Sequence, residues 1–293
     1  MYTTLARVKA ELAASSTVDD AKVLNYMGIV TQRLRGFGYD FEPQYATEYF
    51  TAFSEYTNLS RGTLELINGN GQRMLLASST DVPSIVSDNT AFTYGTQVFS
   101  WPRGASPIKT LRLNDADYTN STTWLPRGGR AFYDTILITG WWGYREQYET
   151  FGWLASGQTI LNVGGITAGG TSITVTNVDG ADALLRIPAF SAGNIIRIEN
   201  EIMLVLSTDT TANKISVRRG MNGTTAAAHA AGTAISIWEW EPDIVQAATR
   251  QVALLYARKG SFTSMEVGGA ATATYPRDLL AELYATMQRF QYT

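Results

Sequence analysis

The residues best suited to acid–base chemistry lie around the chain's one histidine, His229, in the segment RRGMNGTTAAAHAAG at 218–232. Two adjacent threonines, Thr224 and Thr225, precede it, and a histidine near hydroxyl groups is the pairing that nucleophilic catalysis uses. No strand–serine–helix nucleophile motif surrounds the histidine, however. Asn222-Gly223 is a turn dipeptide, so we interpret the segment as a long turn between two strands.

A second candidate is the pair Glu199 and Glu201 in the segment IENEIML, whose spacing predicts that both lie on one face of a strand. Paired carboxylates serve as acid and base in the hydrolysis of glycosidic bonds. The simpler interpretation is a solvated strand face or a turn, with Arg218 or Arg219 paired to one of the glutamates for support.

Other motifs are weaker. NVDGADA at 177–183 lacks the terminal glutamate of a calcium loop. GGITAGGTS at 164–172 has no lysine and no predicted helix after it, so it does not match a phosphate-binding loop. The chain has no cysteine and therefore no thiolate ligand or thiol nucleophile. We predict no catalytic residue, no cofactor and no metal.

The composition also limits the partners. The net charge of −3 argues against a protein that grips nucleic acid through its phosphates, although DNA could slide past such a surface. Only 17% of the residues are charged, below the usual quarter. Two interpretations explain this low fraction of charged residues. The fold is rich in β-strands, or the chain is a subunit whose surface is partly buried against neighbouring subunits. No apolar run is long enough to span a membrane, and the start has no signal-peptide pattern.

Both ends of the chain show helical periodicity. The second helix, after a capping-box pattern at Thr17 and Asp20, carries an apolar stripe of Val23, Met27, Val30 and Leu34. Near the other end, Pro242 and Pro276 each open a helix. The stripes of these two helices are Val245, Ala248, Val252 and Leu255, and Leu280, Leu283, Met287 and Phe290. Helices this short need partners, so we expect the N- and C-terminal pairs to form one bundle.

The middle of the chain is predicted to be β-rich and inserted into that bundle. We expect an α+β fold with three regions: a helical bundle of 1–38 plus 241–293, a β-rich insertion at 39–155, and a second small β module at 156–240. In the last region short alternating strands are separated by Gly, Asn and Asp clusters, which predicts a small, mostly antiparallel barrel or sandwich.

The most aromatic stretch is ITGWWGYREQYETFGWL. Its rings could form a platform for stacking sugars, the seam between the two β regions, or a subunit interface. We favour the seam or the interface, with Trp141, Trp142 and Tyr144 as candidate interface residues.

The order of these segments resembles the head–tail connector, or adaptor, family of tailed double-stranded DNA bacteriophages. The resemblance rests on LARVKAEL and VDDAKVLNYMGIVTQRL at the start and on PDIVQAATRQVALLYAR and YPRDLLAELYATMQRF at the end. ILITGWWGY is similar to the last strand before the third helix in longer members. The segment from FSAGNIIRIENEIMLV to HAAGTAI is similar to a β module inserted in many phage structural proteins. Compact members lack the roughly 200 residues that this chain carries between its helix pairs.

The resemblance implies a structural protein of the virion neck, assembled in the host cytoplasm and without enzymatic activity. It implies a homo-oligomeric ring, usually of twelve subunits, that binds the portal protein and the tail, tail-terminator or nozzle proteins. Genomic DNA would pass through its channel without sequence-specific binding. We expect the fourth helix and tail, with Arg289, Phe290 and Tyr292, to contact the portal or a neighbouring subunit.

Two other classes remain open at this point. The aromatic residues and β-content suit a carbohydrate-binding or adhesion component of a phage tail, although such modules rarely begin and end with helix pairs. Glu199 and Glu201 suit a glycan-degrading enzyme.

Overall fold

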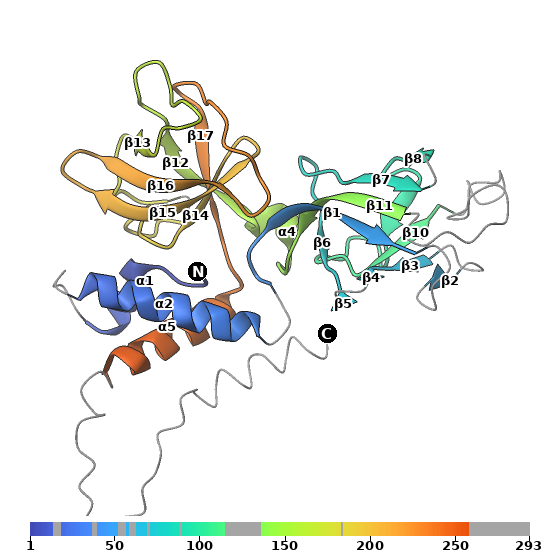
Figure 1. The fold of residues 1–293 in the computed structure, drawn as a ribbon, viewed down its shortest axis with the longest axis horizontal. Helices are drawn as coiled ribbons and strands as arrows, with labels where there is room; N and C mark the ends of the chain where they lie inside the picture. Colours follow the sequence, from blue (N-terminus) through green and yellow to red (C-terminus); the bar gives the residue numbers. More distant parts are fainter. Residues whose placement is uncertain are drawn as a thin grey trace, which may run out of the picture. The chain divides into compact units, whose positions relative to one another are not determined.

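The computed structural model describes residues 1–13, 19–36, 40–51, 57–58, 63–68, 71–87, 90–114, 136–182 and 184–257. Helices combine with antiparallel sheets, which confirms the predicted α+β class, and in the described residues no sheet closes into a barrel (Figure 1). The chain divides into two compact units. Unit 1 comprises Met1–Tyr39, Leu154–Met221 and Thr225–Thr293, and unit 2 comprises Asp40–Trp153 and Asn222–Thr224.

Three helices from the two ends of the chain lie side by side in unit 1 (Figure 1). They are α1 (Leu5–Glu11), α2 (Asp20–Arg35) and α5 (Pro242–Ala257). The hydroxyls of Thr3 and Thr249 are 2.7 Å apart, and the Tyr256 hydroxyl donates to the Asp19 carboxylate. The predicted packing of N-terminal against C-terminal helices is therefore confirmed for these three. The predicted fourth helix, which begins at Pro276, lies outside the described residues.

The apolar stripe of α2 is confirmed, since Val23, Met27, Val30 and Leu34 are all buried. The helix begins at Asp20, so this residue is the first of the helix rather than the third that a capping box requires; Thr17 lies outside the described residues. The stripe of α5 is rotated from the predicted one. Its buried side chains are Ile244, Ala247, Ala248, Thr249, Gln251 and Val252.

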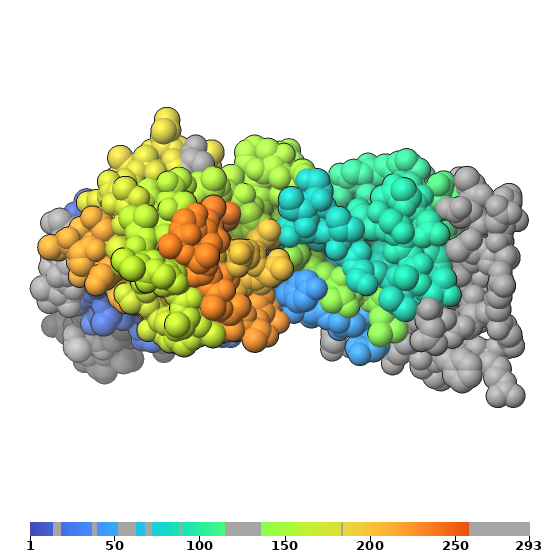
Figure 2. Space-filling model, turned by 90° about the horizontal axis from the view of Figure 1, so that it is seen from above, coloured from blue at the N-terminus to red at the C-terminus, as the bar shows by residue number. Residues whose placement is uncertain are grey.

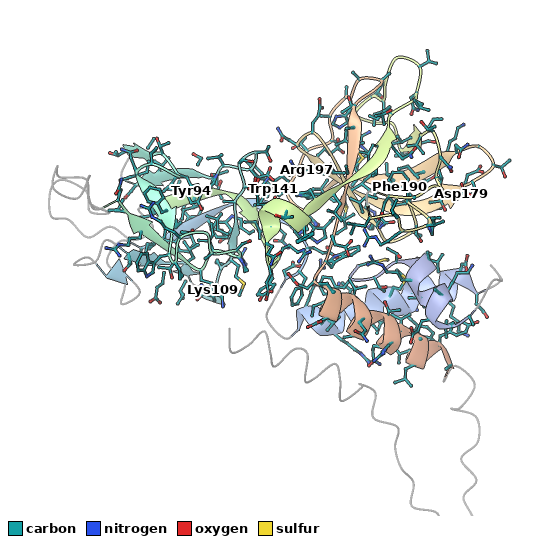
Figure 3. All side chains as sticks on the ribbon, turned by 180° about the vertical axis from the view of Figure 1, so that it is seen from behind. Tyr94, Lys109, Trp141, Asp179, Phe190 and Arg197 are labelled. Carbon is teal, nitrogen blue, oxygen red and sulfur yellow. The ribbon has the colours of Figure 1, made fainter. Side chains whose placement is uncertain are left out.

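Unit 1 also contains a six-stranded antiparallel sheet with the order β12-β17-β14-β15-β16-β13. Its strands are β12 (Trp153–Thr159), β13 (Ser172–Thr174), β14 (Ile195–Ile198), β15 (Glu201–Asp209), β16 (Lys214–Met221) and β17 (Ala234–Trp238). Phe190, labelled in Figure 3, belongs to its apolar core. The Leu5 amide donates to the carbonyl of Ala192 at 3.0 Å. At Gly193 a side chain would lie 2.8 Å from the Thr3 carbonyl, so glycine permits this close approach.

Unit 2 contains the remaining sheets, with the orders β1-β11-β7-β8, where β6 also pairs with β11, then β2-β3-β10-β9, and β4-β5. The strands are β1 (Gln44–Phe50), β2 (Thr57–Asn58), β3 (Thr63–Glu65), β4 (Ile67–Asn68), β5 (Gly71–Gln72), β6 (Leu75–Leu76), β7 (Ser84–Ser87), β8 (Thr90–Phe92), β9 (Val98–Ser100), β10 (Thr110–Leu113) and β11 (Ile136–Trp142). A short helix, α4 (Tyr148–Phe151), follows β11. Alternate side chains of these strands fill one apolar core, which includes Phe50, Leu111 and Trp142.

No helix in the described part of the chain is both long enough and apolar enough to cross a membrane.

Candidate functional site

Residues 222–232 form the long turn that the sequence predicts, between β16, which ends at Met221, and β17, which begins at Ala234. The first four residues of the segment at 218–232 were predicted to belong to this turn, but they extend β16 instead. Asn222 and Gly223 have φ values of +53° and +83°, the left-handed pair that an Asn-Gly corner provides. His229 exchanges two backbone hydrogen bonds of 2.9 Å with Ile166, which attach the turn to the loop before β13. A side chain at Gly165 would lie 2.2 Å from the His229 carbonyl, so only glycine fits beneath it.

The centre of this turn is the carboxylate of Glu201, whose residue is only 1% exposed. The Nε and Nη2 atoms of Arg219 donate to its two oxygens, each at 2.7 Å. The amides of Gly220 and Ala227 also donate to it, each at 2.9 Å, and the Nε2 atom of His229 lies 2.9 Å away. We call Glu201, Arg219 and His229 the buried hub. Every partner fixes a different part of the turn against β15.

The hub holds Glu201 in its charged form. Burial alone raises the pKa of this carboxyl, but hydrogen bonds from Arg219, from His229 and from two backbone amides lower it to about 2. A carboxylate with so many donors is ionised at neutral pH. Its charge is matched by the guanidinium of Arg219, as the burial of an ion pair requires.

Arg219 extends the hub to a second loop. Its Nη1 atom donates to the carbonyls of Thr167 and Gly170, at 3.0 and 2.6 Å. Its Nη2 atom also donates to the carbonyl of Ala227. One guanidinium therefore connects β16, the loop before β13 and the long turn. The sequence predicts that Arg218 or Arg219 pairs with one of the two glutamates. This is confirmed for Arg219, which binds Glu201.

His229 lies between two carboxylates. Its Nδ1 atom is 2.7 Å from an oxygen of Glu199, and its Nε2 atom faces Glu201. A neutral imidazole has a single N–H donor, so both contacts are hydrogen bonds to carboxylates only when the ring carries two protons. Since both nitrogens are engaged, neither is free to take a proton from Thr224 or Thr225. The arrangement is that of a positioned structural histidine rather than a general base.

The prediction that Glu199 and Glu201 share one strand face is wrong. Ile198 pairs with Glu201 across the β14–β15 hairpin, so Glu199 and Asn200 form its two-residue turn. Glu199 has a φ of +53° and a side chain that is 60% exposed, whereas Glu201 is buried. Glycoside hydrolysis needs both carboxylates to face one open site, which these two do not form.

Among the residues that the structure describes, no group of three or more His, Asp or Glu side chains is placed to hold a metal ion.

The predicted interface aromatics are core residues of unit 2. Trp141, Trp142 and Tyr144 are 5%, 2% and 3% exposed. The Trp142 indole donates to the Ala46 carbonyl at 3.0 Å, and the Trp141 ring (labelled in Figure 3) packs at 5.0 Å from that of Tyr45. This packing accounts for the aromatic stretch, and its role at a subunit interface stays a prediction.

Arg289, Phe290 and Tyr292, the other candidate interface residues, lie outside the described residues.

A second cluster in unit 1 was not predicted from the sequence. The Asp182 carboxylate binds the guanidinium of Arg186, which also reaches Glu239. Next to this cluster Leu184, Leu185 and Ile187 are exposed to solvent. The one sequence signal is the run LLRIP at 184–188, in which three apolar residues stand between turn residues and a proline.

No family model matches the chain, and no curated protein matches it in sequence.

Proposed function

We propose that the protein is a structural component of the neck of a tailed bacteriophage, where copies of it form a ring beneath the portal. The observation that carries the proposal is the packing of helices that lie far apart in the sequence. Helices α1 and α2 pack with α5, and the β-rich regions are inserted between them, in the order that the connector resemblance implies. Ring symmetry explains why the chain has so few charged residues, since neighbouring subunits cover part of each other's surface.

The chemistry of the described residues favours a structural role over an enzymatic one. Glu201, the only buried carboxylate of the predicted acid–base pair, accepts five hydrogen bonds and offers no oxygen to a substrate. Both nitrogens of His229 are likewise engaged. Glu201 and His229 hold the turn after β16 in place, a role that suits a structural protein of the virion.

The sugar-binding alternative loses its main support. Trp141 and Trp142, on which a stacking platform would depend, are buried in unit 2. The exposed ring of Trp101 has the guanidinium of Arg112 above it, at 4.5 Å from the ring centre, so that face is not open for a sugar to stack on. We therefore retain the connector as the proposed function.

The partners follow from the same proposal. The ring binds the portal protein on one side and tail, tail-terminator or nozzle proteins on the other, and genomic DNA passes through its channel. The net charge of −3 suits a channel that does not retain phosphates. The protein is then part of the virion and assembles in the host cytoplasm.

Docking to the portal tests this function. The full chain and a variant that lacks residues 288–293 are each mixed with the portal protein of the same virus and imaged by negative-stain electron microscopy. We expect the full chain to add a ring to the portal and the shortened chain, with an unchanged circular dichroism spectrum, not to do so. A full chain that ignores the portal and binds polysaccharide instead would overturn the proposal in favour of an adhesion protein.

A further inference from the structure

The outer face of β9 and β10 combines aromatic rings with arginines. Arg112 lies opposite Phe99 in the antiparallel register of the two strands. Val98 and Leu111, the residues next to them, are 0% exposed and belong to the core of unit 2. Because side chains alternate along a strand, Phe99 and Arg112 lie on the opposite, outer face, and Trp101 follows Phe99 there. We call this set the basic-aromatic face: Phe99, Trp101, Arg103 and Arg112.

Both arginines of the basic-aromatic face lie above a ring. The Cζ atom of Arg103 is 3.9 Å from the centre of the Phe99 ring, and that of Arg112 is 4.5 Å from the centre of the Trp101 ring. A guanidinium stacks on a ring through its flat face, so the contact with Phe99 does not use the N–H donors of Arg103. Trp101 is 47% exposed, and Arg103 is exposed as well. The face therefore presents cations and rings together at the surface.

The loop after β9 holds Arg103 in its position. The Trp101 amide donates to the Thr110 carbonyl at 2.9 Å, which extends the pairing of the two strands. The Gly104 amide donates to the Ser100 hydroxyl at 3.0 Å, and Gly104 has a φ of +76°, which favours glycine. Because these bonds order the loop in the free protein, a ligand that binds Arg103 loses little free energy to the ordering of the loop.

The segment around the face is positively charged, although the whole chain has a net charge of −3. Residues 90–114 contain Arg103, Lys109 and Arg112 but no Asp or Glu, so their net charge is +3. Figure 2 shows the segment around residue 100, drawn in turquoise, at the surface of unit 2. Within the part of the chain that the structure describes, the Arg103 guanidinium has no ion-pair partner. The neighbouring strand β3 adds one carboxylate, that of Glu65. The net charge of the chain therefore does not describe this surface.

We propose that the basic-aromatic face binds single-stranded nucleic acid. Arg103 and Arg112 contact backbone phosphates, and unpaired bases stack over the pairs of guanidinium and ring. Proteins that bind single strands without sequence preference combine cations along the backbone with aromatic side chains under the bases. Bases stack on guanidinium planes as they do on rings. The pair of Arg112 and Trp101, which is closed to a sugar, is therefore open to a base.

Two other anionic partners fit the face less well. A duplex keeps its bases paired and stacked, so it uses the cations of the face but not its rings. An acidic polypeptide segment also uses the cations alone, since its carboxylates have no ring to stack. The proposal concerns residues of unit 2 only and does not rest on the proposed ring or on the connector function.

The test is the fluorescence anisotropy of a fluorescein-labelled oligothymidylate, titrated with the full chain at several salt concentrations. The logarithm of the binding constant should fall with the logarithm of the salt concentration with a slope of about −1.4, that is about −0.7 for each of two phosphates. Arg103→Gln should reduce this slope by about 0.7. Arg218→Gln is the matched control and should leave it unchanged, because Arg218 is an exposed arginine on β16, outside the face.

The contribution of the rings is measured separately. Trp101→Leu should weaken binding about tenfold, and Trp101→Phe should restore most of the affinity, since stacking needs an aromatic ring. Circular dichroism spectra of the variants check that each is folded. The proposal is overturned if the unmodified chain does not bind the oligothymidylate, or if a duplex of the same length or polyglutamate binds as tightly. It is also overturned if Trp101→Leu binds normally or if Arg218→Gln loses as much affinity as Arg103→Gln.

Discussion

Unit 1 contains two clusters of the same design that differ in burial. In each, a carboxylate binds an arginine and two backbone amides: Glu201 with Arg219 in the buried hub, and Asp182 with Arg186 at the loop of residues 184–187. The Arg219 side chain is 6% exposed, whereas that of Arg186 is 33% exposed. The same chemistry therefore stabilises the fold at one site and presents a surface at the other.

Burial determines how much each cluster contributes to stability. A buried ion pair adds little net stability relative to an apolar replacement, but removal of one partner leaves an unpaired charge away from water. A partly exposed pair loses much less, because water replaces the missing partner. The buried hub should therefore be intolerant of single substitutions, and the Asp182 cluster should tolerate them at the cost of loop order.

The largest effect is expected at Arg219. Arg219→Met removes the guanidinium that binds both oxygens of the buried Glu201 carboxylate, which costs about 3–5 kcal/mol of unfolding free energy. Urea unfolding followed by tryptophan fluorescence measures this cost. The double variant Glu201→Met with Arg219→Met removes both charges and should recover a substantial part of it. A single variant within about 0.5 kcal/mol of the unmodified chain contradicts the role of the hub, since surface changes have effects of that size.

The next effect is a dependence of stability on acid. The folded-state pKa of Glu201 is about 2, against a usual value of 4.5. The lowered pKa contributes stability that is fully present above the unfolded-state value and is lost as the pH falls from about 4.5 towards 2, amounting to about 3 kcal/mol. Urea midpoints between pH 7 and pH 2 measure it. In Glu201→Gln this part of the acid dependence should be absent, and an unchanged profile would show that other carboxylates cause it.

A smaller effect is expected at Asp182. Asp182→Asn weakens the contact to Arg186 at a partly exposed site, so we expect about 1 kcal/mol of lost stability. The larger consequence is local, because the amides of Leu184 and Arg186 lose a charged acceptor. Hydrogen exchange measured by mass spectrometry should show faster exchange at 184–187 and unchanged exchange at 219–229. Equal acceleration in both segments would remove the distinction between the two clusters.

The smallest effect is expected at Glu199, whose side chain is 60% exposed. Glu199→Gln should change the unfolding free energy by no more than about 1 kcal/mol. It should still change the NMR signal of the Nδ1 atom of His229, because this atom loses its charged neighbour. The chain has a single histidine, so its one pair of ring nitrogen signals needs no assignment. Identical ring nitrogen signals from both proteins would contradict the contact between Glu199 and His229.

Much of the architecture could be predicted because two patterns are visible in the sequence: apolar residues at helical spacing, and alternating apolar and polar residues in strands. Val23, Met27, Val30 and Leu34 recur at helical spacing and are all buried. The stripe of α5 was misplaced because alanines and Gln251 also face the bundle there, and hydrophobicity alone does not distinguish them. The Asn222-Gly223 corner was predictable, since few residue pairs tolerate two positive φ values.

The buried hub was harder to predict because its residues lie far apart in the sequence and meet only in the folded chain. Arg219 and Glu201 were candidates for pairing, but the sequence does not show that two backbone amides and His229 complete the contact. The single strand expected for Glu199 and Glu201 was wrong because Glu199 occupies the first position of a two-residue turn with a positive φ, where Asn, Asp or Gly is usual. Exposure of Leu184 and Leu185 could not be foreseen, since an apolar run predicts burial and only tertiary contacts reveal otherwise.

The proposed function requires that copies of this chain assemble into one closed ring. Its most direct test is the mass distribution of the purified full chain, measured by mass photometry alone and with the portal of the same virus, with the same samples imaged by negative stain. We expect one dominant species whose mass is a fixed multiple of 32.0 kDa and ring-shaped particles in the images. A mass of 32.0 kDa under both conditions, with no rings, would contradict it.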